Sequence, residues 1–166
     1  MTEVFIDIEN TIIESLDNPE FLDNNCHRIT NFLKRLRRQG GDISWIDRVH
    51  LNTWGWKTAE EIDWDLVDDL FNKLGVNAWE QGEVFTKVDG VNTAIHKGWL
   101  NEADKERALF PGMMKEFGIS KVSCFCNMVE KPDTTFVLID DLVDIDEEIN
   151  RPDKIKIQLF NPKSLK

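Results

Sequence analysis

Acidic side chains stand at the ends of two short apolar runs of this chain. Asp7 and Glu9 lie two residues apart at the end of the first run, which begins at Val4. In an extended backbone such side chains point the same way, so both carboxyl groups could reach one cation or one reacting atom. Asp140 and Asp141 follow a second apolar run, residues 135–139. These residue types at these spacings suit metal binding and carboxylate chemistry.

The runs that carry the acids are expected to be buried parallel strands. Neither run alternates apolar with polar residues, which is typical of central strands that helices cover on both faces. Acids at the carboxyl ends of such strands lie where open α/β sheets bind ligands. If the two strands are neighbours, all four carboxylates share one cleft. Their mutual repulsion then calls for a hard divalent cation, and oxygen ligands favour Mg²⁺.

The pattern around these acids resembles the haloacid dehalogenase (HAD) superfamily of aspartyl-phosphate phosphatases. Residues 7–11 read D-I-E-N-T and resemble the first motif, D-x-D-x-T, except that Glu9 replaces the second Asp of hydrolytic members. Residues 136–141 resemble the fourth motif, an apolar strand that ends in two acids. Thr53 is the candidate for the second motif, and Lys131 is the candidate for the third.

The resemblance implies a fold and an activity. The fold would be a three-layer, Rossmann-like α/β domain over residues 1–166, with a mainly parallel sheet in which the Asp7 strand is central and the Asp140 strand is its neighbour. The activity would be Mg²⁺-dependent hydrolysis of a small phosphorylated substrate. Asp7 would form an aspartyl-phosphate, Glu9 would act as acid and base, Thr53 would bind a phosphoryl oxygen and Lys131 would balance the acids. The metal ligands would be Asp7, the backbone carbonyl of Glu9, and Asp140 or Asp141.

The glutamate at position 9 leaves the activity open. Its extra methylene moves the carboxyl group by about 1.5 Å, and a misplacement of about 1 Å can lower a rate roughly 100-fold. The chain is therefore interpreted as an active phosphatase, a slow one, or a HAD-like protein that binds a nucleotide or a protein partner without turnover. A further interpretation is that the four acids only cap loops.

The sequence indicates the substrate less clearly than the reaction. Trp54 and Trp56 follow Thr53 and could stack on a base or sugar at the rim of the cleft, although packing in the core or a lid is the favoured interpretation. Residues 129–131, V-E-K, are similar to the 5'(3')-deoxyribonucleotidase branch, which makes a nucleotide a candidate substrate. Residues 76–110 match none of the four motifs and are a candidate small cap insertion.

Periodicity predicts the remaining elements. Apolar residues at helical spacing predict helices over 26–38, which Gly40 and Gly41 would end, and over 58–74. Apolar or alternating runs predict strands over 84–88, 121–126 and 154–160. The strand over 154–160 would be an edge strand whose lysines face water.

Composition bounds the class of protein. A chain of 166 residues with 31 acids against 20 bases has a formal charge of −11, which opposes binding of extended nucleic acid or anionic lipid. No 18-residue apolar stretch could span a membrane, and no basic segment precedes an apolar one at the N-terminus, which predicts a cytoplasmic protein. Three cysteines predict no disulfide framework. The oligomeric state is left open.

Overall fold

A single sheet organises the chain in the computed structural model, which describes residues 1–39 and 46–166. Within those residues, six strands lie in the order β3-β2-β1-β4-β6-β5. They are β1 (Thr2–Ile6), β2 (Ile46–Asn52), β3 (Gln81–Phe85), β4 (Thr135–Ile139), β5 (Glu147–Asn150) and β6 (Lys156–Phe160). Among these six described strands, only the pairing of β5 with β6 is antiparallel. The predicted central position of the Asp7 strand, with the Asp140 strand beside it, is confirmed.

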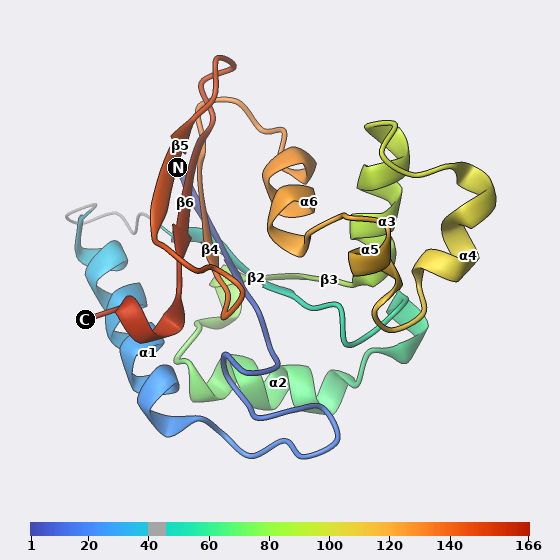
Figure 1. Ribbon diagram of the computed structural model, residues 1–166. Helices are drawn as coiled ribbons and strands as arrows, with labels where there is room; N and C mark the ends of the chain where they lie inside the picture. The colour runs from blue at the N-terminus through green and yellow to red at the C-terminus, as the bar shows by residue number, and fades with distance from the viewer. Residues whose placement is uncertain (40–45) are drawn as a thin grey trace.

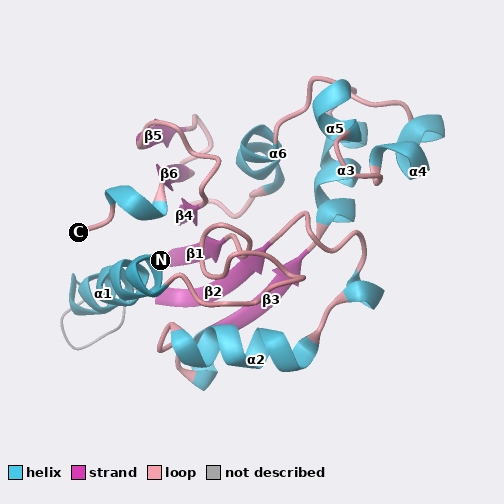
Figure 2. Cartoon of the chain, turned by 60° about the horizontal axis from the view of Figure 1, so that its bottom comes forward, coloured by secondary structure: helices cyan, strands magenta, loops and turns pink. Residues whose placement is uncertain are grey.

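Helices cover both faces of the sheet (Figures 1 and 2). On one face lie α1 (Asp23–Gln39) and α2 (Trp64–Lys73), and on the other lies α6 (Lys121–Met128), against which α3 (Lys87–His96) packs. The shorter α4 (Lys105–Ala108) and α5 (Met113–Glu116) extend the second layer near α3. The predicted α/β class is therefore confirmed.

The pleat of β1 decides which side chains meet which helices. Val4 and Ile6 pack with Leu33 of α1, whereas Phe5 packs with Phe125 of α6 on the opposite face. Successive side chains of a strand alternate between faces. The residue after Ile6 therefore faces α6, and that residue is Asp7.

The predicted strand over 121–126 is wrong, because these residues form α6. The Ser120 hydroxyl accepts a hydrogen bond from the Ser123 amide at 3.0 Å and so caps the helix. The side chains of Lys121, Cys124 and Phe125 are buried, which is the i, i+3, i+4 face of a helix. A short apolar run does not distinguish a strand from a buried helix. Here the serine cap favours the helix.

Other expectations also need correction or refinement. The predicted strand over 84–88 coincides with β3 only at residues 84–85, because α3 begins at Lys87. The predicted helix over 58–74 is divided into a 3-10 turn at Ala59–Glu61 and α2. Strand β6 does not form an edge, because β5 pairs with it on the outer side; Ile157 and Leu159 still alternate with Lys156 as predicted. Residues 76–110 divide into β3, which belongs to the main sheet, and a helical part from α3 onward that packs against α6.

The first helix confirms the periodicity argument. Ile29, Leu33 and Leu36 of α1 are buried in the core as their spacing predicts. The glycines expected to end this helix, Gly40 and Gly41, lie outside the described residues. Among the helices of residues 1–39 and 46–166, none combines the length and apolar character needed to cross a lipid bilayer.

Candidate active site

Asp7 and Asp140 occupy equivalent places on neighbouring strands. Strands β1 and β4 pair in parallel with Ile6 opposite Ile139, so the next residues along each chain are Asp7 and Asp140. The Asp7 amide donates to the Ile139 carbonyl at 2.9 Å, which continues the ladder by one step. Both side chains are buried, with 4% and 0% exposed. The pleat turns both carboxylates toward α6.

Lys121, the first residue of α6, joins the two carboxylates. Its Nζ lies 2.5 Å from Asp7 Oδ1 and 2.8 Å from Asp140 Oδ2. The Thr11 hydroxyl donates to Asp7 Oδ2 at 2.9 Å and accepts from the Asp141 amide at 3.1 Å. Both oxygens of Asp7 are therefore held, and the loop after β1 is tied to the loop after β4.

The charges in this cluster do not balance. Asp7, Asp140 and Asp141 can each offer an oxygen within 4.8 Å of the others, and Lys121 supplies one positive charge. Burial raises the pKa of Asp7 to about 6 despite the opposing charge of Lys121, and it raises the pKa of Asp140 and Asp141 as well. Three carboxylates against one ammonium leave two negative charges, so the donor set fits one divalent cation with oxygen ligands.

The carboxylate of Glu9 lies away from these three aspartates. Its Oε2 accepts a hydrogen bond from the Leu16 amide at 3.1 Å, and its Oε1 occupies space beside Gly55, where a Cβ would be 2.4 Å away. The oxygens of Glu9 are not among those that meet within 4.8 Å. The structure therefore does not place the Glu9 carboxylate among the metal-ligand candidates, although Glu9 lines the same cavity.

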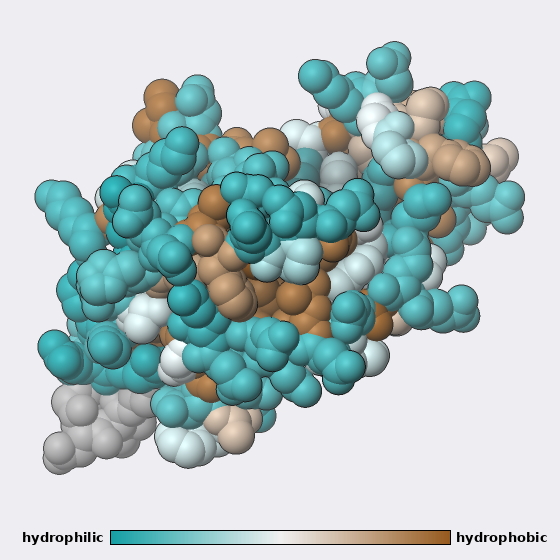
Figure 3. Space-filling view, turned by 90° about the horizontal axis from the view of Figure 1, so that it is seen from below, coloured by the Kyte–Doolittle hydropathy of each residue, from teal (hydrophilic) through white to brown (hydrophobic). Residues whose placement is uncertain are grey.

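A cavity of about 520 Å³ opens onto the cluster at the carboxyl ends of the strands. Asp7, Glu9, Asp141 and Lys121 line it, and Thr53, which follows β2, lines it as well. Figure 3, which shows the molecule from below the view of Figure 1, shows hydrophilic residues around a central hydrophobic area. Such a volume is typical of small-molecule sites. The first, second and fourth candidate motifs therefore share one cavity.

Trp54 and Trp56 lie in different environments. Trp54 lines this cavity, whereas Trp56 is only 7% exposed and packs in the core between the sheet and α1 and α2. The favoured packing interpretation thus holds for Trp56, which is not at the rim of the cleft. Trp54 remains a candidate for substrate contact.

Lys131 is not at the site. It is 52% exposed and lies 3.5 Å from Glu3 and 3.6 Å from Asp47, at the amino ends of β1 and β2. It precedes β4, whereas the acids follow this strand, and a strand of five residues spans about 17 Å. Lys131 was chosen because it lies close to Asp140 in the sequence, but it lies at the opposite edge of the sheet.

Two lysines were missed by the sequence reasoning. Lys121 was assigned to a strand, but a lysine just after a serine cap, with apolar residues three and four positions later, is the signal of an inward-facing lysine that needs acidic partners. Lys87, at the start of α3, is 5% exposed and donates from Nζ to the Phe110 carbonyl at 2.8 Å. Burial, and then the charge of Lys57, lowers the pKa of Lys87.

Comparison with protein families, with characterised proteins and with solved structures finds no match for this chain. The resemblance to the HAD superfamily therefore stays a prediction from the sequence motifs.

Proposed function

We propose that the protein is a Mg²⁺-dependent phosphomonoester phosphatase of the HAD kind that acts through an aspartyl-phosphate on Asp7. The observation that carries the proposal is the contact of Lys121 Nζ with both Asp7 and Asp140 at the carboxyl ends of adjacent parallel strands. A buried nucleophilic carboxylate needs a fixed orientation and a nearby positive charge, and Lys121 and Thr11 supply them.

The chemistry assigned to the chain's own residues is a double displacement. A carboxylate oxygen of Asp7 forms a bond to phosphorus while the bond from phosphorus to the ester oxygen breaks, and Glu9 gives that oxygen its proton. Glu9 then takes a proton from water, whose oxygen displaces Asp7 from phosphorus and releases inorganic phosphate. Mg²⁺ held by Asp7, Asp140 and Asp141 would neutralise charge on the phosphoryl group.

The second candidate function is binding of a phosphorylated ligand without its hydrolysis. The hydrogen bond from the Leu16 amide holds Glu9 away from the aspartates, which favours a protein that binds a phosphorylated ligand, a nucleotide among the candidates, without hydrolysing it. This alternative and the phosphatase share the cavity and the Mg²⁺ ligands. They differ in whether Asp7 attacks phosphorus and Glu9 transfers protons.

Phosphate release separates the two functions. We would assay nucleoside monophosphates and p-nitrophenyl phosphate with Mg²⁺ and with chelator, comparing the native protein with Asp7→Asn and Glu9→Asp. Release that needs Mg²⁺ and is lost in Asp7→Asn supports the phosphatase. Release only from Glu9→Asp indicates a site held inactive by its glutamate. No release from either protein, with a nucleotide still bound in the presence of Mg²⁺, supports the binding function and contradicts the phosphatase.

A further inference from the structure

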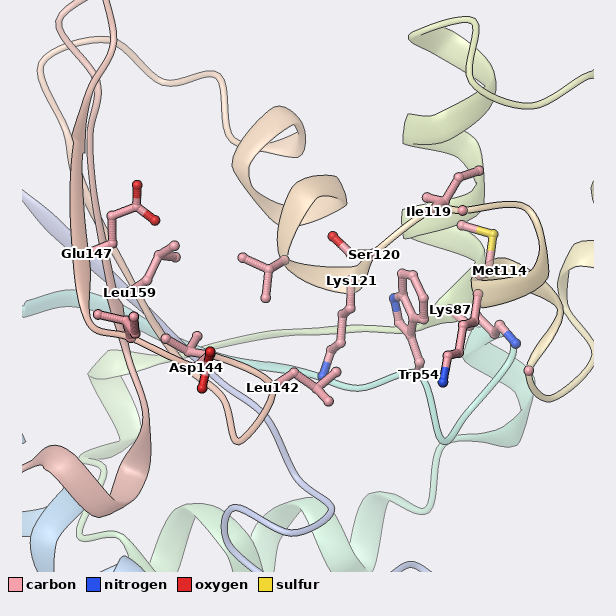
Figure 4. A pocket seen from close by; sticks show the side chains of 16 residues that line it. Trp54, Lys87, Met114, Ile119, Ser120, Lys121, Leu142, Asp144, Glu147 and Leu159 are labelled. Atoms are coloured by element: carbon pink, nitrogen blue, oxygen red, sulfur yellow. The ribbon is translucent and has the colours of Figure 1, made fainter.

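A second, larger cavity adjoins the acidic one. It measures about 770 Å³ and lies between α6, α5 and the loop that follows β4 (Figure 4). The two cavities share five lining residues, so they lie side by side. These residues are Trp54, Lys87, Gly112, Lys121 and Leu142. A ligand whose phosphate lies beside Asp7 would pass this junction into the larger cavity.

The lining of the larger cavity is mainly apolar. Met114 of α5, Val122 of α6 and Ile119 of the segment between these helices form part of its wall. Leu142 and Ile145 lie at its rim in the loop after Asp141, where they are 61% and 78% exposed. Large apolar side chains exposed beside a cavity lose contact with water when an apolar ligand covers them.

Trp54 gives the junction a flat wall. Its ring lies against α3 at Gly90, where a Cβ would be 2.8 Å from Trp54 Cζ2, so the absence of a side chain at Gly90 makes room for the indole. Figure 4 shows this ring between the side chains of Lys121 and Lys87. An indole fixed by its neighbours can stack on another planar ring without losing much side-chain freedom.

We propose that the larger cavity holds a flat aromatic leaving group of the substrate, stacked on Trp54, while the phosphate lies at Asp7. This inference rests on the proposed phosphatase function and narrows its substrates to phosphate monoesters with a planar ring in the leaving group. A nucleobase and a simple aryl group share this chemistry, and the nucleoside monophosphates in the assay above distinguish the first from the second.

Binding of phosphonates tests the inference apart from turnover, because their carbon–phosphorus bond is not an ester bond. We would measure by calorimetry, with Mg²⁺, the affinity of the native protein for 1-naphthylmethylphosphonate and for ethylphosphonate. We expect the naphthyl compound to bind at least about tenfold more tightly, since it alone reaches the apolar wall. Equal affinities, or no binding of either compound, would overturn the inference.

Variants test whether the preference for the naphthyl compound arises in the larger cavity. Trp54→Leu keeps an apolar side chain but removes the ring, and Ile145→Asn makes the exposed rim polar; each should lower the affinity ratio several-fold. Trp64→Asn changes another exposed apolar residue, 59% exposed and lining neither cavity, and should leave the ratio unchanged. A ratio that neither cavity variant changes would overturn the inference. Turnover without aromatic preference contradicts only this inference, whereas preference without turnover contradicts only the phosphatase.

Discussion

Gly55 and Glu9 share one small volume: a Cβ on residue 55 would lie 2.4 Å from Glu9 Oε1 and 3.2 Å from its Cδ. The absence of a side chain at position 55 thus lets the longer acid fold back toward the Leu16 amide. The glutamate and the glycine form a pair in space, although 45 residues separate them in the chain.

The pair predicts the effect of adding a methyl group. Gly55→Ala should lower the free energy of unfolding by about 1–3 kcal/mol, the usual cost of overpacking, because Glu9 and Leu16 must both move. Urea denaturation would measure this. In a double-mutant cycle, Glu9→Asp should recover part of the loss, since the shorter acid withdraws from position 55. Strict additivity of the two changes would show that Glu9 is not the side chain that Gly55 accommodates.

Lys121 and Lys131 form a matched pair for mutation. Lys121→Met leaves two buried carboxylates without their partner and should cost about 3–5 kcal/mol in the free energy of unfolding. Lys131→Met removes only exposed contacts at 3.5 and 3.6 Å and should cost less than about 1 kcal/mol. Chemical denaturation of both variants at neutral pH tests this. Similar losses in the two variants would contradict the assignment of Lys121 to the acidic cluster.

Metal binding should stabilise the fold through the aspartates. At a Mg²⁺ concentration about 100 times its Kd, the expected gain is about 2.7 kcal/mol, and a chelator should reverse it. Thermal unfolding with and without Mg²⁺ would measure the shift in Tm. Asp141→Asn should reduce the shift, whereas Asp68→Asn, an exposed acid on α2, serves as the control. An unchanged Tm in the native protein would exclude tight Mg²⁺ binding at this cluster.

A buried ion pair away from the site predicts a pH dependence. Burial alone would raise the pKa of Glu80, but Arg37, at 2.8 Å, and the Asn77 amide, at 3.0 Å, outweigh it and lower that pKa below 4.5. A carboxyl group with a lowered folded-state pKa stabilises the protein above its unfolded pKa, and this contribution is lost as the pH falls through the folded value.

Acid unfolding of variants tests whether Glu80 loses its stabilising contribution as the pH falls. Between pH 6 and pH 3.5, the native protein should lose more stability than Glu80→Gln, which has no carboxylate to protonate. Glu83→Gln, an exposed change on β3, is the control for removing one negative charge. If Glu80→Gln lost as much stability over this range as the native protein, the pair with Arg37 would not carry the predicted contribution.

The sequence was sufficient for the strands that carry the acids. Unbroken apolar runs ending in acids predicted β1 and β4, because a central parallel strand requires that pattern. Their adjacency was expected from the family resemblance, and the structure confirms it. The sequence failed for α6, whose inward face repeats over too few turns to distinguish it from a strand, and therefore Lys121 was missed. It also missed β5, a short edge strand of largely polar residues that is defined by its pairing with β6.

The conformation of Glu9 was not predictable for a different reason. The motif fixes the backbone position of residue 9, but its side chain follows contacts with Leu16 and Gly55 that come from other segments. Likewise, Trp54 and Trp56 are near neighbours in sequence, yet one lines the cavity and the other lies in the core. Residue type alone does not separate them, since the turn between them decides which tryptophan faces the cavity.

The parallel register of β1 and β4 makes the site depend on the parity of residue counts. Inserting one residue into β4 ahead of Asp140 would turn its carboxylate toward the face of α1 and α2, where apolar residues such as Ile29 and Leu33 form the core. Inserting two residues would restore the face but shift the carboxylate by about 6.6 Å along the strand. The chain can therefore vary the loops between these strands in length, but neither strand can gain or lose a single residue without dismantling the cluster.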